Sequence, residues 1–159
     1  MAASANTKTT KDEKKKPVVI IAGPTASGKS ALAVDVAQAF DGVVINADSM
    51  QVYRELRVIT ARPSAAEEAS APHRLYGVLD AGTRCSAGRW VEMAKAEIEA
   101  AWGSDKLPVV VGGTGLYLKA LMEGLSDLPD VPAETRAEAT EMLARPYRKP
   151  WVHPDPKKV

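Results

Sequence analysis

Near its N-terminal end the chain reads Gly23-Pro24-Thr25-Ala26-Ser27-Gly28-Lys29-Ser30, which matches the pattern G-x-x-x-x-G-K-[ST]. Residues 18–22, just before it, are an apolar run of the kind that forms a strand buried on both faces. Residues 30–40, just after it, carry apolar side chains at helical spacing. These apolar positions are Leu32, Val36, Ala37 and Phe40. A strand, a glycine-rich loop and a helix in this order form the context in which the pattern binds phosphate.

The residue types of this loop suit phosphate binding. Gly23 and Gly28 are expected to let the backbone turn so that successive amide N–H groups point at phosphate oxygens. The following helix N-terminus adds partial positive charge, Lys29 adds a full charge, and Ser30 adds a hydroxyl that can hold Mg²⁺. The motif predicts a phosphate-bearing ligand and leaves open which one, and whether phosphate is transferred, hydrolysed or expelled.

Short apolar runs alternate with helical patterns along the rest of the chain. The expected strands are residues 43–46, 75–79 and 107–111. The expected helices are residues 86–102, 116–123 and 133–144. Residues 53–72 are expected to be loop with some helix. Strands that alternate with helices pair in parallel through crossovers, so we expect an α/β fold, a P-loop-type parallel sheet flanked by helices.

The ends of the chain differ from this core in composition. We divide the sequence into a disordered, lysine-rich tail at residues 1–16, an α/β core at 17–144 and an irregular, proline-rich segment at 145–159. The last segment is either an ordinary flexible tail or the sign of a longer protein that is cut or frame-shifted at this point. In the second case the core is incomplete.

Composition narrows the class of protein. The chain has 159 residues, of which 45% are hydrophobic and 26% charged, and this is the ordinary globular range. The net charge of +1 gives no sign of a nucleic-acid partner. A single cysteine, Cys85, forms no internal disulfide and fits a reducing compartment. No apolar run approaches the roughly 20 residues of a membrane span. We expect a cytoplasmic monomer that does not associate with membranes.

Two polar residues follow predicted strands. Asp48 comes after residues 43–46, and Thr114 comes after residues 107–111. Because the carboxyl ends of parallel strands share one edge of a sheet with the phosphate loop, Asp48 is expected to face the ligand. Asp48 either accepts a proton or helps to hold the metal, or it only forms a turn. Thr114 either presents its hydroxyl to the ligand or caps the next helix.

Five segments of the chain together carry a resemblance to one known family. They are Ile21-Ala-Gly-Pro-Thr-Ala-Ser-Gly-Lys-Ser30, Asn46-Ala-Asp-Ser-Met-Gln-Val-Tyr53, Thr60-Ala-Arg-Pro63, Pro72-His-Arg-Leu75 and Leu107-Pro-Val-Val-Val-Gly-Gly-Thr-Gly-Leu-Tyr117. In this order and spacing they resemble the tRNA dimethylallyltransferases, also called IPP transferases. The second and fifth segments together are far more specific than the phosphate loop alone. The resemblance ends before Arg145, and members of that family are longer.

The resemblance implies a reaction. The phosphate loop would hold the diphosphate of dimethylallyl diphosphate, with Mg²⁺ as cofactor. The exocyclic amine of the adenosine beside the anticodon of tRNA would attack the allylic carbon, and diphosphate would leave. The resemblance implies that Asp48 takes the proton of the amine and that Lys29 and Thr114 lie at the reacting groups.

The resemblance also implies contacts with the anticodon stem-loop of tRNA. The residues that would contact the target adenosine are Asp48, Ser49, Met50, Gln51 and Thr114. Arg136 matches a family arginine that contacts tRNA, and otherwise it is a solvated arginine on a helix. The helical insert with which the family grips the anticodon arm lies beyond the matching segments. We therefore expect this chain to bind diphosphate weakly and to modify tRNA poorly.

Three other functions stay open at this point. The first is a small-molecule P-loop kinase in which Asp48 aligns an acceptor hydroxyl. The second is an adenylate isopentenyltransferase, which shares these motifs and uses a free adenine nucleotide as acceptor. The third is a phosphate-binding remnant without catalytic activity.

Overall fold

The computed structural model describes residues 16–126 and 131–144, which belong to two compact units. The first unit extends to Leu125, and the second begins at Ser126. All four strands found among the described residues belong to the first unit, and one helix belongs to the second. Residues 1–15 of the predicted lysine-rich tail and all of the predicted segment 145–159 lie outside the described residues.

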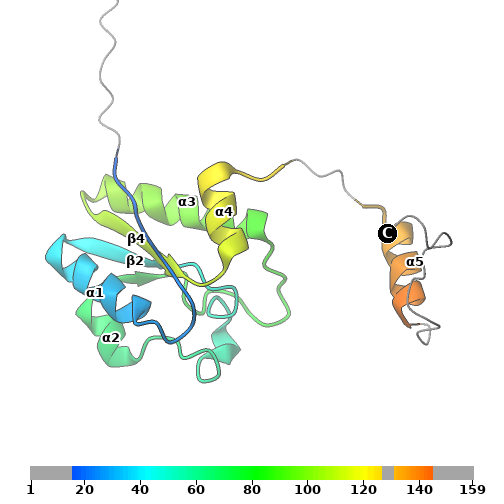
Figure 1. The fold of residues 1–159 in the computed structure, drawn as a ribbon, viewed down its shortest axis with the longest axis horizontal. Helices are drawn as coiled ribbons and strands as arrows, with labels where there is room; N and C mark the ends of the chain where they lie inside the picture. Colours follow the sequence, from blue (N-terminus) through cyan, green and yellow to red (C-terminus); the bar gives the residue numbers. More distant parts are fainter. Residues whose placement is uncertain (1–15, 127–130, 145–159) are drawn as a thin grey trace, which may run out of the picture. The chain divides into compact units, whose positions relative to one another are not determined.

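A parallel sheet forms the centre of the first unit (Figure 1). Its strands are β1 (Val19–Ala22), β2 (Gly42–Asn46), β3 (His73–Arg74) and β4 (Leu107–Gly112). They lie in the order β1-β4-β2-β3, and each neighbouring pair is parallel. The prediction of a parallel α/β sheet is confirmed. The carboxyl ends of all four strands therefore lie at one edge, where α/β proteins bind their ligands.

Helices cover both faces of the sheet. They are α1 (Lys29–Ala39), the 3₁₀ turn η1 (Arg54–Leu56), α2 (Ala65–Ser70), α3 (Ala87–Gly103) and α4 (Gly115–Glu123). α1 and α2 lie on one side of the sheet, and α3 and α4 lie on the other (Figure 1). Local chemistry sets their ends. Ser86 accepts a hydrogen bond from the backbone N–H of Arg89 at 3.2 Å and so caps α3, and Gly124, with φ of 85°, ends α4.

Side chains alternate between the two faces of the sheet, as the pleat of a strand requires. On the α1 side, Val44, Val109 and Val111 pack with Ala33 and Ala37. These small helix residues let α1 approach the sheet closely. The prediction is confirmed for Ala37, whereas Ala33 was not predicted to be buried and Leu32 and Phe40 were.

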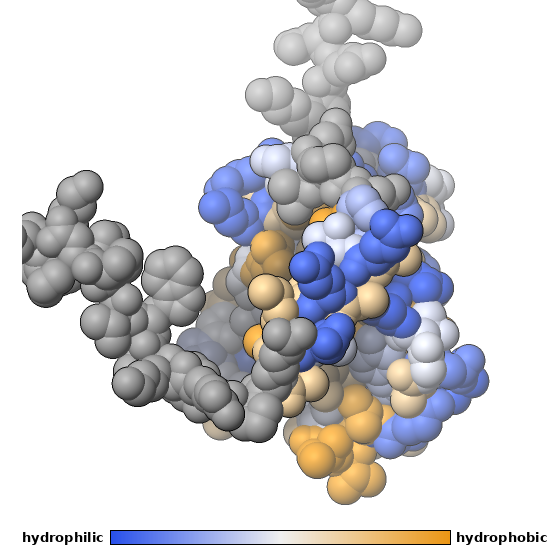
Figure 2. Space-filling view, turned by 90° about the vertical axis from the view of Figure 1, so that its right-hand side faces the viewer, coloured by the Kyte–Doolittle hydropathy of each residue, from blue (hydrophilic) through white to orange (hydrophobic). Residues whose placement is uncertain are grey.

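Leu32 and Phe40 are in fact largely exposed, with 51% and 66% of their surface open to solvent. They point away from the sheet because Ala33 and Ala37 set the face that packs. Other large apolar side chains of the first unit also reach the surface (Figure 2), among them Val58 and Ile59.

The other face of the sheet holds the larger core. Val43, Ile45 and Val110 pack against α3 and α4. The residues of α3 predicted to be buried, Trp90, Ala94, Ile98 and Ala101, are all buried. The Trp90 ring stacks on the ring of Tyr117 from α4, with centroids 4.7 Å apart and planes 14° apart. This contact joins the two helices, and it sits beside the end of β2 because the Trp90 indole N–H donates to the Asn46 carbonyl at 2.9 Å.

One strand prediction is wrong, and the burial of another strand differs from the prediction. Residues 75–79 do not form a strand, because Leu75 and Gly77 adopt φ of 63° and 60°, in the left-handed region that extended strands exclude. The third strand is the shorter β3 just before them. Residues 18–22 were expected to be buried on both faces, yet β1 is only partly buried because it lies at the edge of the sheet.

The second unit contains the helix α5 (Ala133–Ala144), as predicted. Its first turn closes when the Arg136 backbone N–H donates to the Pro132 carbonyl at 3.1 Å. Among the described residues of both units, no helix has the length and apolar character needed to cross a membrane.

The close approach of β2 to β4 generates a prediction about Gly112. A Cβ at Gly112 would lie 2.3 Å from the backbone carbonyl carbon of Ala47, so one of the two strand ends has to move. We expect Gly112→Ala to lower the free energy of unfolding by about 1–3 kcal/mol. Gly115→Ala is the matched control, because a Cβ there meets no atom within 4 Å. Equal unfolding temperatures of the two variants in a thermal melt would contradict this expectation.

Candidate active site

A cavity of about 460 Å³ opens at the edge of the sheet where the strands end. It is lined by five parts of the chain, which are the phosphate loop with the first turn of α1, the segment after β2, the loop before α2, Tyr76 after β3, and the end of β4. Its lining residues include Thr25, Ala26, Ser27, Gly28, Lys29, Ser30, Asp48, Met50, Gln51, Ile59, Thr60, Tyr76, Val111 and Gly112. The cavity thus joins the predicted phosphate loop to Asp48, although the two lie on different strands.

The phosphate loop has the backbone geometry that the motif predicts. Gly28 adopts φ of 81° and Ala26 φ of 63°, so the chain turns sharply just before α1 begins at Lys29. The N-terminus of α1 therefore opens at the cavity and offers unpaired backbone N–H groups to an anion. The Lys29 ammonium donates to the Pro24 carbonyl at 2.9 Å, which folds this side chain back over the loop.

Gly23 and Pro24 do not line the cavity. Gly23 has no positive φ, but a Cβ there would lie 3.1 Å from the Ser27 hydroxyl oxygen. Glycine is favoured at position 23 because a larger residue would crowd the Ser27 side chain inside the loop. Gly113 lies close to the phosphate loop, since a Cβ built at Gly113 would lie 3.4 Å from the Gly23 carbonyl oxygen. The chain just after β4 thus packs against the phosphate loop.

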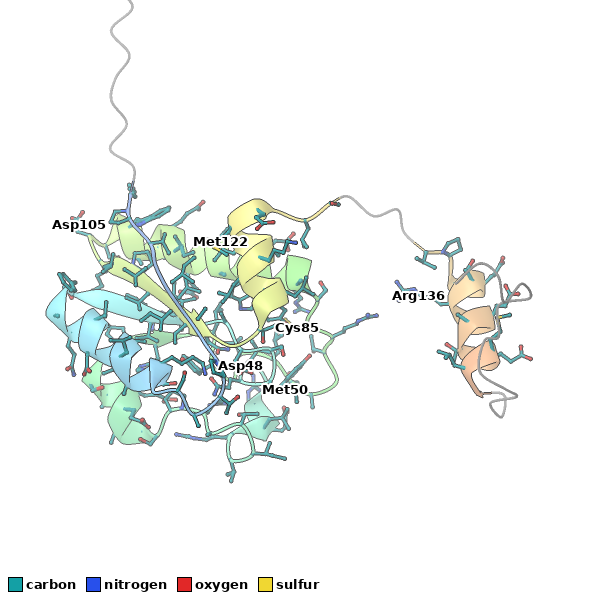
Figure 3. The ribbon with its side chains drawn as sticks, in the orientation of Figure 1. Asp48, Met50, Cys85, Asp105, Met122 and Arg136 are labelled. Carbon is teal, nitrogen blue, oxygen red and sulfur yellow. The ribbon has the colours of Figure 1, made fainter. Side chains whose placement is uncertain are left out.

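Asp48 lies directly after β2, beside Met50 (Figure 3). Its carboxylate oxygen Oδ1 accepts hydrogen bonds from the backbone N–H groups of Met50 at 2.8 Å and Gln51 at 3.3 Å. The interpretation of Asp48 as a turn former is therefore confirmed. The same side chain also lines the cavity, and no hydrogen bond from the described residues reaches its second oxygen, Oδ2.

Thr114 precedes α4, and the prediction that its side chain caps this helix is wrong. Its hydroxyl oxygen instead accepts a hydrogen bond from the backbone N–H of Ser49 at 2.9 Å. Its own backbone N–H donates to the Ala47 carbonyl at 3.3 Å. Thr114 and Ser49 are not lining residues of the cavity, so Thr114 lies behind the segment that carries Asp48. Its predicted role at the reacting groups stays a prediction.

Sequence reasoning missed one side of the cavity. Gln51 donates from its side-chain amide to the Thr60 carbonyl at 2.8 Å, and this bond holds the loop with Ile59 and Thr60 beside the cavity. Tyr76 lines the same cavity, and burial together with the nearby negative charge of Asp48 raises the pKa of its hydroxyl. The segment 60–63 belongs to the family resemblance and was the available signal for this side, whereas Tyr76 lies within residues 75–79, which were predicted to be a strand.

Arg136 lies on α5 in the second unit, and every residue that lines the cavity belongs to the first unit. Its backbone takes part in helix hydrogen bonds with Pro132 and Thr140. A contact of Arg136 with tRNA therefore stays a prediction.

The charges around the cavity are arranged in two places. The Lys29 ammonium and the N-terminus of α1 follow β1, and the Asp48 carboxylate follows β2. β4 lies between β1 and β2, so the axes of these two strands are two strand spacings apart, about 10 Å. An anion held at the first place would thus leave room for a second group to approach Asp48.

These features define a P-loop α/β protein in which the P-loop motif and the Asp48 carboxylate line one cavity. The chain belongs to the IPP transferase family, because the sequence model of that family matches residues 51–154. The tRNA dimethylallyltransferase of Rhodospirillum rubrum is 62% identical over 128 residues, which cover 80% of this chain and 39% of that protein. The tRNA dimethylallyltransferase of Rhodospirillum centenum is 59% identical over 138 residues, which cover 87% of this chain and 44% of that protein. The chain thus spans about two fifths of the length of these curated relatives.

Solved structures agree with this family. The full-length tRNA isopentenylpyrophosphate transferase from Bacillus halodurans superposes with a TM-score of 0.69 at 34% identity, over 81% of this chain and 43% of that one. A eukaryotic dimethylallyltransferase studied while acting on tRNA superposes with a TM-score of 0.67 at 38% identity, over 70% of this chain and 28% of that one.

The placement of Lys29 generates a prediction about anion binding. We expect Lys29→Ala to weaken binding of inorganic diphosphate with Mg²⁺ by about 10- to 100-fold, the effect of one charge-assisted hydrogen bond. Lys95→Ala is the control, since Lys95 is an exposed lysine of α3 outside the cavity. Isothermal titration of both variants measures the difference. Equal affinities would show that the loop is not the diphosphate site.

Proposed function

We propose that this chain supplies the catalytic core of a tRNA dimethylallyltransferase, which moves a dimethylallyl group from dimethylallyl diphosphate to the exocyclic amine of the adenosine next to the anticodon. The observation that carries this proposal is the shared cavity, where the phosphate loop and Asp48 face one space from two strands of the same sheet. The named activity of the relatives supports it.

The phosphate side of the cavity suits a leaving diphosphate. In the proposed reaction the amine nitrogen forms a bond to the allylic carbon while the bond from that carbon to the diphosphate oxygen breaks. The electron pair of the broken bond stays on diphosphate, so negative charge grows there. Lys29 and the backbone N–H groups of the loop and of α1 stand where this charge appears, and they stabilise the transition state more than the bound substrate.

The residues present fit Mg²⁺ together with diphosphate. Mg²⁺ takes one or two oxygen ligands from a protein and completes its shell with water and substrate phosphates. The cavity offers the Ser30 hydroxyl as such a ligand, and the described residues contain no cluster of three or more acidic, histidine or cysteine ligands. Bound with diphosphate, the ion would supply further positive charge to the leaving group.

Asp48 suits the acceptor side. Two backbone N–H groups hold its Oδ1, which fixes the direction of the carboxylate, and Oδ2 is left to take the proton that the amine loses. The adenine has to leave its stack to reach this position, as it does in other enzymes that act on bases. Met50 and Gln51 line the cavity beside Asp48 and would contact the extruded base. Arg136 would contact the tRNA from the second unit.

The turn geometry of Asp48 allows a sharp test of its role as base. Asp48→Asn keeps an oxygen that accepts the hydrogen bonds from Met50 and Gln51, but its amide cannot take a proton. We expect turnover to fall by about 100-fold or more while diphosphate affinity stays nearly unchanged. The assay uses this chain completed with the C-terminal part of the Rhodospirillum rubrum relative, and Asp80→Asn is the control for an exposed carboxylate. Recovery of the full rate at high Mg²⁺ would make Asp48 a metal ligand instead.

The nature of the donor is a separate question, which a thermal-shift assay of the chain answers. We expect dimethylallyl diphosphate with Mg²⁺ to raise the unfolding temperature more than ATP with Mg²⁺ does, since the cavity has to hold a diphosphate and an apolar group. Stabilisation by ATP alone would favour a small-molecule kinase.

The acceptor is tested by comparing AMP with an unmodified anticodon stem-loop in the completed chain. We expect transfer to the stem-loop, because the relatives are enzymes named for tRNA. Transfer to AMP alone would identify an adenylate isopentenyltransferase.

A further inference from the structure

One buried polar side chain stands out near Asp48. Asn46, the last residue of β2, is the only buried polar or charged residue among those the structure describes, and none of its surface is exposed. A buried amide is costly unless each of its polar atoms has a partner. It lies two residues before Asp48, which lines the cavity, and is not itself a lining residue.

The Asn46 side chain uses both its oxygen and its nitrogen. Its Oδ1 accepts a hydrogen bond from the backbone N–H of Asp48 at 2.9 Å. Its Nδ2 donates to the Asp48 carbonyl at 3.0 Å and to the Leu75 carbonyl at 3.1 Å. One side chain thus makes hydrogen bonds to the peptide groups on both sides of Asp48 and to a second segment of the chain.

The bonds of Asn46 belong to an unbroken series. The backbone N–H groups of residues 47 to 51 all donate within the described chain. Their acceptors are, in order, the Val111 carbonyl, Asn46 Oδ1, Thr114 Oγ1 and Asp48 Oδ1, the last of which accepts from both Met50 and Gln51. Side chains supply four of these five bonds. The path of the segment is therefore set by side chains, and a sheet ladder alone would not hold it.

The second segment held by Asn46 also leads to the cavity. Leu75, whose carbonyl accepts from Nδ2, has φ of 63°, and its neighbour Tyr76 lines the cavity. A leucine in the left-handed region is strained and persists only where its surroundings hold it. The Asn46 amide is one of the groups that hold Leu75, through its bond to the Leu75 carbonyl. It therefore connects the segment that contains Asp48 to the segment that contains Tyr76.

We infer that Asn46 is the positioning residue of this site, which fixes the Asp48 carboxylate and the Tyr76 side of the cavity relative to each other. The consequence for chemistry rests on the proposed function of Asp48 as base, whereas the positioning itself does not. Other side chains do this less well. Serine keeps an acceptor for the Asp48 N–H but has a single hydrogen to donate, and alanine has neither.

Amide hydrogen exchange of the full 159-residue chain, followed by NMR, tests the inference. In Asn46→Ala we expect exchange at Asp48, Met50 and Gln51 to speed up by about 10-fold or more relative to the amides of β4. In Asn46→Ser the increase at Asp48 should be smaller, because the hydroxyl still accepts its N–H. Ile98→Ala is the control, since it removes core packing on α3 without touching this series of bonds.

A merely structural role for Asn46 gives a different pattern. Exchange would then rise by one common factor throughout β2, β4 and residues 48–51, as in Ile98→Ala, and that result would overturn the inference. An unchanged pattern at residues 48–51 would overturn it too. If Asn46→Ala is too unstable to study, the comparison of Asn46→Ser with Ile98→Ala decides between the same two patterns.

Kinetics of the completed chain provide a second readout. We expect Asn46→Ala to lower kcat by about 10-fold or more, with KM for dimethylallyl diphosphate within about 3-fold of the parent value, since the phosphate loop is untouched. A rise in KM with unchanged kcat would contradict positioning of Asp48. Absence of transfer by the parent chain would count against the proposed function alone, because the exchange pattern still tests the role of Asn46.

Discussion

The parallel pairing of β2 with β4 is the constraint on which the rest of the site depends. It sets Asn46 beside Val111 and continues past the strands, where the Ala47 N–H donates to the Val111 carbonyl at 2.7 Å. Because Gly112 has no side chain, the two strand ends can meet without a clash. The Thr114 hydroxyl oxygen then accepts a hydrogen bond from the Ser49 N–H, which holds the turn after β2 against the turn after β4. A shift of one residue in this register would move Asp48 out of the cavity.

This pairing also separates two kinds of chemistry. The phosphate loop follows β1 and Asp48 follows β2. β4 lies between these two strands and packs against the ends of both. Positive charge and unpaired N–H groups are thereby kept on the side where a diphosphate would sit, and the carboxylate stays on the other. Lys29 and Asp48 follow strands that are two strand spacings apart, about 10 Å, and opposite charges at that separation attract each other less than in a contact ion pair.

Much of this arrangement could be predicted from the sequence. The phosphate loop has a fixed spacing with glycines, and the α3 face with Trp90 has a clear helical period, so both were found. The segment 75–79 was mistaken for a strand, because its apolar residues hide the positive φ of Leu75. Asn46 was predicted only as the end of a strand and as part of a motif, since nothing in one sequence shows which hydrogen bonds a buried amide will make. Long-range partners such as Thr114 and Ser49 depend on strand order, which the sequence left open.

In the proposed reaction one cavity holds diphosphate at the loop and directs the reacting carbon toward Asp48. A crystal structure of the chain with Mg²⁺ and an analogue of dimethylallyl diphosphate, in which sulfur replaces the oxygen that links carbon to phosphorus, tests this directly. The account predicts diphosphate oxygens on the backbone N–H groups of residues 25–30 and an allylic carbon that faces Oδ2 of Asp48. Diphosphate bound elsewhere, or an allylic group that points away from Asp48, would contradict it.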